Sequence, residues 1–154
     1  MSAARPERPI RIRVGGVFIQ GQSILLVRHQ KGGRSYWLLP GGGVEYGEGL
    51  AEALEREMQE ECGLAVRVKG LLFVNESLPP DRHRHIVNLT FLGEVLSGEA
   101  HLNEDDGVLA EVAWVPRDKL PGLTFFPNFK QRLLEAWDSG FTLPAADLGN
   151  LWES

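Results

Sequence analysis

The sequence lacks several features that would place it in a specialised class of protein. Its single cysteine, Cys62, excludes an internal disulfide. No hydrophobic run approaches the length of a membrane span, and residues 1–9 lack the apolar core of a signal peptide. With 16 Lys and Arg against 21 Asp and Glu, the net charge of −5 offers no basic surface for a nucleic-acid polymer. We therefore expect a cytoplasmic protein that binds neither membrane nor nucleic-acid polymer; a free nucleotide stays compatible with this charge.

The length of 154 residues and the 43% hydrophobic content suit one domain with a proper core. We expect a flexible arm over residues 1–9, the domain over 10–140 and a tail over 141–154. The tail lacks clear periodicity but contains large apolar residues. Such a tail packs either on its own domain or on a second subunit, so a homodimer is one expectation.

Alternating and apolar segments predict a set of strands, and one late segment predicts a helix. The helix has apolar residues on one side over residues 127–138 and is followed by Gly140. The segments around residues 31–35, 76–84 and 102–109 are expected to be loops. The predicted strands are residues 10–18, 23–28, 36–39, 65–68, 71–75, 85–96 and 111–115.

The acidity of the chain is concentrated in residues 42–64. This stretch contains seven Glu and one Arg, for a net charge of −6, so the rest of the chain sums to +1. Apolar residues recur within it at spacings of three and four, which predicts a helix, and Gly63 stands where a left-handed cap would end that helix. The stretch is therefore expected to form an acidic helix between two glycine-rich turns.

Three carboxylates of this helix, Glu57, Glu60 and Glu61, lie on or beside its apolar face, within an arc of about 100°. No Lys or Arg stands three or four residues after Glu57 or Glu60. Because burying unpaired carboxylates costs free energy, a divalent cation such as Mg²⁺, which prefers oxygen ligands, would resolve the arrangement. The alternative interpretation is a solvated acidic face on a surface helix.

The same residues resemble the Nudix box. Gly42, five residues, Glu48, seven residues and then the run from Arg56 to Leu64 fill every specified position of that family's pattern. The resemblance covers 23 of the 154 residues. It implies an α/β fold, an α/β/α sandwich with a mixed β-sheet between helices, and a Mg²⁺- or Mn²⁺-dependent hydrolase. Gly49 departs from many relatives, which carry a Ser or Thr helix cap at this position.

The resemblance also implies roles for the residues of the box. Glu57, Glu60 and Glu61 would ligate metal, and Glu48 would help through hydrogen bonds or a further metal ion. Arg56 would hold a carboxylate by a bidentate contact. Family members often take their catalytic base from a loop beyond the box. Glu104, Asp105 and Asp106 are favoured here over Glu111, and the alternative interpretation is a solvated acidic loop.

Substrate contacts are expected from cations and from main chain that a ligand can approach closely. Arginine grips phosphate through two hydrogen bonds, and glycine leaves the backbone open. Each arginine has an alternative interpretation, as a strand-end or loop charge in solvent. The candidates are Arg28, Arg34, Gly42, Gly43, Arg82 and Arg84.

The resemblance implies cleavage of the pyrophosphate linkage of a nucleoside diphosphate joined to another group. Pro79 and Pro80, which follow the box, resemble the ADP-ribose subgroup and favour ADP-ribose or another ADP-sugar. A nucleoside triphosphate pyrophosphatase, including one acting on oxidised nucleotides, and a dinucleoside polyphosphate hydrolase are alternatives. A module of this fold that senses a nucleotide without cleaving it is a further alternative, although such modules commonly lose box carboxylates.

Overall fold

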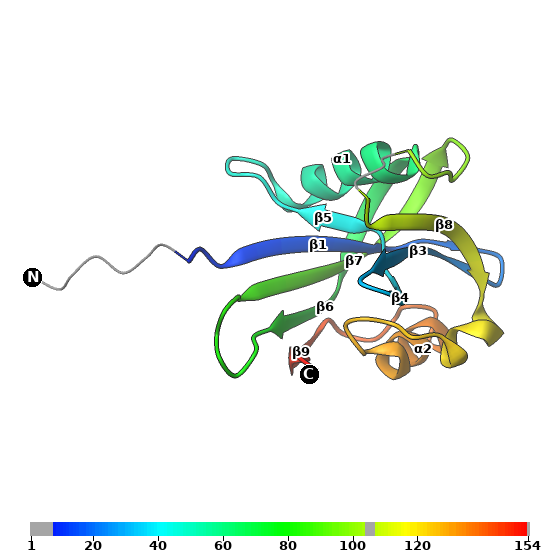
Figure 1. Cartoon of the computed structure of the whole chain (residues 1–154). Coiled ribbons are helices and arrows are strands. Elements are labelled where there is room, and N and C mark those ends of the chain that lie inside the picture. The colour runs from blue at the N-terminus through cyan, green and yellow to red at the C-terminus, as the bar shows by residue number, and fades with distance from the viewer. Residues whose placement is uncertain (1–7, 104–106, 154) are drawn as a thin grey trace, which may run out of the picture.

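The computed structural model describes residues 8–103 and 107–153 of the chain. Two α-helices lie on opposite sides of a central layer of strands, α1 above it and α2 below it in Figure 1. The layers confirm the predicted α/β/α sandwich with mixed β-structure between helices. In the described part of the chain, no helix is long and apolar enough to cross a membrane.

The larger sheet has the strand order β5-β1-β7-β6-β9. The central strand β7 pairs parallel with β1 and antiparallel with β6, while β9 joins the edge parallel to β6. The short edge strand β5 pairs antiparallel with β1 and carries the glycine run into the site. The strands are β1 (Arg11–Val17), β5 (Gly41–Gly43), β6 (Ala65–Ser77), β7 (Ile86–Ser97) and β9 (Ala146–Asn150).

The smaller sheet is built around β3, which pairs antiparallel with each of its neighbours in turn. The strands in this sheet are β2 (Ile19–Gln20), β3 (Ser23–Lys31), β4 (Arg34–Leu38) and β8 (Leu109–Pro116). Phe18, between β1 and β2, links the two sheets because its carbonyl accepts a hydrogen bond from the Leu25 amide.

Two apolar clusters hold the layers together. One lies on the side of α1 (Leu50–Cys62) and includes Leu54 and Met58, both fully buried. The other includes Leu133 of α2 (Lys130–Asp138) and Leu120 of the 3₁₀-helix η1 (Arg117–Gly122). Each α-helix therefore buries its apolar stripe against the strands, and α1 buries Glu61 as well.

The left-handed cap predicted at Gly63 is present. Gly63 has φ 69°, its amide donates to the Gln59 carbonyl, and the next amide, that of Leu64, donates to the Met58 carbonyl. At the other end of α1, Gly49 offers no side-chain cap, in agreement with its departure from the Ser or Thr of many relatives. Cys62 is fully buried beside this helix end.

Several predicted boundaries were wrong. Residues 31–35 are not a loop, because Gly32 and Gly33 both take left-handed angles and form a two-residue hairpin between β3 and β4. The segments at 65–68 and 71–75 were predicted as two strands but form one, whose pairing register with β7 shifts between Val68 and Gly70. The helix begins at Lys130 instead of residue 127, and the tail contains β9. The predicted arm lies outside the described residues over 1–7.

Candidate active site

The site is centred on the face of α1 that meets β5. The Glu57 carboxylate lies directly over Gly42, so close that a Cβ atom at this glycine would lie 2.4 Å from Cδ and 2.6 Å from both oxygens. Gly43 has no such neighbour, since nothing lies within 4 Å of the position its Cβ would take. The absence of a side chain at Gly42 therefore makes room for the Glu57 carboxylate. A substrate contact at Gly42 or Gly43 stays a prediction.

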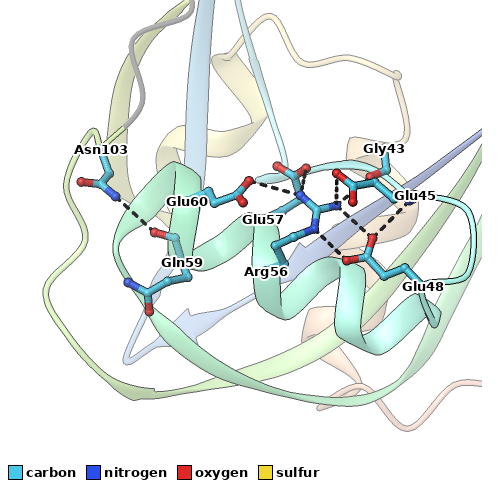
Figure 2. A network of polar contacts seen from close by, with 8 residues as sticks. All are labelled: Gly43, Glu45, Glu48, Arg56, Glu57, Gln59, Glu60 and Asn103. Atoms are coloured by element: carbon cyan, nitrogen blue, oxygen red, sulfur yellow. Dashed lines mark hydrogen bonds and ion pairs between the residues drawn. The ribbon is translucent and has the colours of Figure 1, made fainter.

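Arg56 organises the carboxylates of the box (Figure 2). Its Nε and Nη2 donate to the two oxygens of Glu48 at 2.7 and 2.9 Å, a bidentate pair. Its Nη1 donates to Glu57 at 2.8 Å and to Glu60 at 3.2 Å. Its Nη2 also reaches the Gly43 carbonyl at 3.1 Å, which ties the helix to β5. One guanidinium thus contacts three box carboxylates and the glycine strand.

Glu48 fixes the loop that enters α1. One of its oxygens accepts a hydrogen bond from the Glu45 amide at 3.1 Å, and its own amide donates to the Glu45 carbonyl. The hydrogen bond from Arg56, and then that from the Glu45 amide, hold the pKa of Glu48 below its ordinary value. The same contact with Glu48 raises the pKa of Arg56, so both groups stay charged.

Glu61 lies on the inner side of the site, where it is 9% exposed. Arg13 of β1 approaches from the sheet, with Nη2 donating to the Leu39 carbonyl at 3.4 Å. Burial lowers the pKa of Arg13, and the negative charges of Glu61 and then Glu57 oppose that shift. Arg13 therefore brings a second guanidinium into the electrostatic field of these carboxylates, and no sequence pattern predicted it.

A family model described as the NUDIX domain matches residues 9–137 of the chain. The chain belongs to the Nudix family. It is 34% identical over 115 residues to an ADP-ribose pyrophosphatase of Methanocaldococcus jannaschii and 35% identical over 128 residues to a human 8-oxo-dGDP phosphatase. The matches cover 74% and 77% of this chain but 66% and 38% of those relatives, so this chain corresponds to only part of their length.

The fold comparison agrees with the family. A NUDIX hydrolase from Nitrosomonas europaea superposes with a TM-score of 0.74 at 22% identity, over 88% of this chain and 93% of its own. At that identity the likeness establishes the Nudix fold and leaves the substrate open.

Nudix hydrolases generally need divalent metal ions, and the donor chemistry of this site fits one. The carboxylates offer hard oxygen ligands, and Glu57 lies against a backbone that only glycine leaves open. Within residues 8–103 and 107–153, no three His, Cys, Asp or Glu side chains are arranged so that they could hold a metal ion. Arg56 instead engages Glu57 and Glu60. Since Mg²⁺ typically takes one or two carboxylates and completes its shell with water and phosphate, a ready three-ligand set is not required.

Two of the predicted substrate arginines lie in the smaller sheet. Arg28 of β3 donates to Glu111 of β8 at 3.1 Å, directly across the strand pair, and also contacts Gln30 and Ser35. Arg34 stands at the exposed end of the Gly32–Gly33 hairpin, opposite Lys31 in register. These contacts place Arg28 and Glu111 in one surface ion pair, separate from the Arg56 network.

The other two arginines belong to the segment between β6 and β7. Arg82 takes a left-handed conformation with φ 56°, and Arg84 lies over the Trp152 ring at 4.9 Å. His83 also meets Trp152 edge-on and pairs with Asp81 at 2.6 Å, which lowers the pKa of that carboxyl. The segment is thus held by the C-terminal tail, a contact that no local sequence pattern revealed.

The favoured catalytic bases, Glu104, Asp105 and Asp106, lie outside the described residues. The chain immediately before them is fixed to the C-terminal end of α1. The Asn103 amide donates to the Glu61 carbonyl at 3.1 Å, and its side chain donates to the Gln59 carbonyl at 3.3 Å (Figure 2). The predicted base segment therefore follows directly in sequence on a residue that contacts α1.

Sequence reasoning also missed a group of polar residues on the larger sheet. Asn75, Asn88 and Thr90 are buried and line a small cavity together with Arg13. The only available signal was the polar positions within otherwise apolar strands, and these are equally typical of a solvent-facing alternation. Strand pairing, which the sequence does not specify, turned them inward.

Proposed function

We propose that this protein hydrolyses the pyrophosphate linkage of a nucleoside diphosphate joined to another group, with ADP-ribose or another ADP-sugar as the leading substrate. The observation that carries the proposal is the complete box assembled around Arg56, with Glu48, Glu57 and Glu60 in contact with one guanidinium. The archaeal relative is named an ADP-ribose pyrophosphatase, which favours the ADP-sugar class.

The cofactor that we propose is Mg²⁺ or Mn²⁺, held by Glu57, Glu60 and Glu61 with support from Glu48. When bound, it neutralises charge on the pyrophosphate and lowers the pKa of a bound water. Arg56 orients Glu57 and Glu60 through its Nη1 contacts, and Glu48 fixes Arg56 by the bidentate pair. An acidic residue of the 104–106 segment would accept the proton of the attacking water.

A second candidate function is removal of phosphate from an oxidised nucleotide. It is favoured by the human relative, which is named an 8-oxo-dGDP phosphatase and aligns over 77% of this chain. A nucleoside triphosphate pyrophosphatase belongs to the same chemistry. The two candidate functions use the same carboxylates and differ in the residues that hold the nucleotide. The products of the reaction therefore distinguish the two functions.

The test is product analysis after incubation with ADP-ribose, ADP-glucose, 8-oxo-dGDP, nucleoside triphosphates and diadenosine polyphosphates, each with Mg²⁺, with Mn²⁺ and with chelator. We expect AMP and a sugar phosphate, and no products with chelator. Release of a nucleoside monophosphate together with pyrophosphate or phosphate would favour the second candidate function. Saturable nucleotide binding without turnover would contradict the hydrolase and favour a sensing module.

We propose a cytoplasmic enzyme, as the sequence predicts, and a homodimer in which the tail takes part. The tail already pairs with its own domain through β9, and the Asn150 side chain contacts both the amide and the carbonyl of Leu78. Light scattering of the full chain and of a form ending at residue 140 tests the dimer.

A further inference from the structure

The capping segment, residues 98–103, follows β7 and closes the C-terminal end of α1. The last four carbonyls of an α-helix have no partner within the helix itself. Here the Cys62 carbonyl accepts a hydrogen bond from the His101 amide at 3.1 Å. The Glu61 carbonyl accepts one from the Asn103 amide, also at 3.1 Å. Two alternate main-chain amides of the capping segment therefore satisfy two carbonyls of the last helical turn.

The capping segment packs closely on the helix end. A Cβ atom at Gly63 would lie 2.2 Å from Cε1 of His101, and one at Gly98 would lie 2.7 Å from the Gly63 carbonyl oxygen. The Nδ1 atom of His101 lies 2.8 Å from the Glu99 carbonyl oxygen, which fixes the ring against the helix. Because there is no free space between them, the position of the capping segment and that of the last turn of α1 depend on each other.

Asn103 makes two contacts that bracket two of the box carboxylates. Its main-chain amide donates to the Glu61 carbonyl, and its side-chain Nδ2 donates to the Gln59 carbonyl at 3.3 Å (Figure 2). Glu60 and Glu61 stand between these two carbonyls along the helix. The first contact needs no particular side chain, whereas the second requires a side chain with a hydrogen-bond donor. The asparagine side chain therefore adds a second point at which this turn is held.

Electrostatics works against the last turn of α1. The carbonyls at a helix C-terminus carry partial negative charge, so carboxylates are unfavourable there. Glu60 and Glu61 both stand in this turn, which contains no basic residue. The Glu60 side chain is 47% exposed, so packing does not fix it, and Arg56 reaches it only from the preceding turn, at 3.2 Å. Donors to the carbonyls therefore hold the backbone of this turn against that repulsion.

We propose that Asn103 is a positioning residue for the metal site and acts on Glu60 and Glu61 through the backbone of the last turn of α1. The inference rests on the proposed function, which assigns these carboxylates to Mg²⁺ or Mn²⁺. Mg²⁺ demands near-ideal geometry from its oxygen ligands, so a turn that frays binds it less tightly. An uncharged amide suits the role. A Lys or Arg could donate to the same carbonyl but would also compete with the cation for the carboxylates.

The experiment titrates the protein with Mn²⁺ in the absence of nucleotide, with free Mn²⁺ followed by electron paramagnetic resonance. Removing a group that orients metal ligands lowers metal affinity by about 10- to 100-fold, so we expect Asn103→Ala to weaken Mn²⁺ binding about 10-fold. In kinetics, the same variant should lower kcat and leave the KM for nucleotide unchanged. Asn103→Gln keeps a donor amide and should bind Mn²⁺ more tightly than Asn103→Ala.

Asn150→Ala is the matched control. The Asn150 side chain holds the main chain of Leu78 through two hydrogen bonds, away from α1. It is an exposed asparagine that clamps a backbone, as Asn103 is. Its removal should therefore keep the wild-type affinity for Mn²⁺.

Each result decides the proposal. Equal Mn²⁺ affinity in wild type and folded Asn103→Ala overturns it, because a cap that is only structural lowers Tm without changing metal binding well below Tm. Equal losses in Asn103→Ala and Asn103→Gln also overturn it, since the donor would then not matter. Asn103→Leu, which has a similar shape and no donor, replaces the alanine variant if that variant does not fold.

Failure of the proposed function is visible separately. A wild type that binds Mn²⁺ but hydrolyses no nucleotide contradicts the proposed function, and the Mn²⁺ affinities of the variants still decide the inference. A wild type that hydrolyses nucleotide but binds no Mn²⁺ on its own overturns the inference and leaves the function in place.

Discussion

Gly42→Ala should separate the fold of this protein from its chemistry. The new Cβ would lie 2.4 Å from the Glu57 Cδ, where ordinary contact begins near 3.4 Å, so the carboxylate must move by about 1 Å. The movement is easy for the protein to accommodate, because Glu57 is 15% exposed and its carboxylate is the end of a flexible side chain. The Gly42 backbone itself is not left-handed, so alanine adds no conformational strain there.

We therefore expect a small change in stability and a large loss of turnover. A displacement of about 1 Å in a catalytic group lowers the rate on the order of 100-fold. The assay is kcat under saturating substrate with a Mg²⁺ titration, alongside thermal unfolding. Gly43→Ala is the matched control, since nothing lies within 4 Å of its Cβ position.

Equal activities for the two alanine variants would refute the reasoning, because they would show that the position of Glu57 over Gly42 does not matter for the reaction. A Gly42→Ala protein that unfolds would refute it in another way, since the structure predicts that Glu57 moves and the strand stays in place.

Further predictions concern single residues of the same region. Glu60→Gln or Glu61→Gln should keep the circular dichroism spectrum and lower turnover on the order of 100-fold or more; activity within tenfold of wild type would contradict the metal-ligand assignment. Because the folded-state pKa of Glu48 is lowered, its contribution to stability is present above its unfolded pKa and is lost as pH falls through the folded value. The difference in Tm between wild type and Glu48→Gln should therefore vanish in acid, and a constant difference would exclude this linkage. Burial raises the pKa of the Cys62 thiol, so iodoacetamide should modify it only as the protein unfolds, which mass spectrometry of native and denatured samples measures.

Much of the fold was predictable because its signals are local. The apolar stripe of α1 and the glycine after it predict a helix and its end from a few adjacent residues. The Gly32–Gly33 hairpin was missed although its signal is local too, because glycine pairs serve loops as well as two-residue turns. The tail strand β9 had no local signal, since it exists through pairing with β6.

The residues of the candidate site also separate into those with a local signal in the sequence and those without one. The box residues stand on one short strand, one turn and one helix that follow each other directly, so their spacing in sequence already places them together. Arg13, Asn75 and Asn88 come from three strands, and only the register of β1, β7 and β6 aligns them. Because a shift of one residue would turn each side chain to the opposite face, no sequence pattern specified this row.

The charge of the carboxylates around Arg56 strengthens the case for a divalent cation. No Lys or Arg stands three or four residues after Glu57 or Glu60, but Arg56 precedes Glu60 by four residues and contacts it at 3.2 Å. Such a helical pair contributes only about 0.3–0.5 kcal/mol. More importantly, one guanidinium carries one positive charge, whereas it faces Glu48, Glu57 and Glu60 together. Arg56 therefore donates hydrogen bonds to these three carboxylates but balances only one of their negative charges. A divalent cation would balance the remaining negative charge.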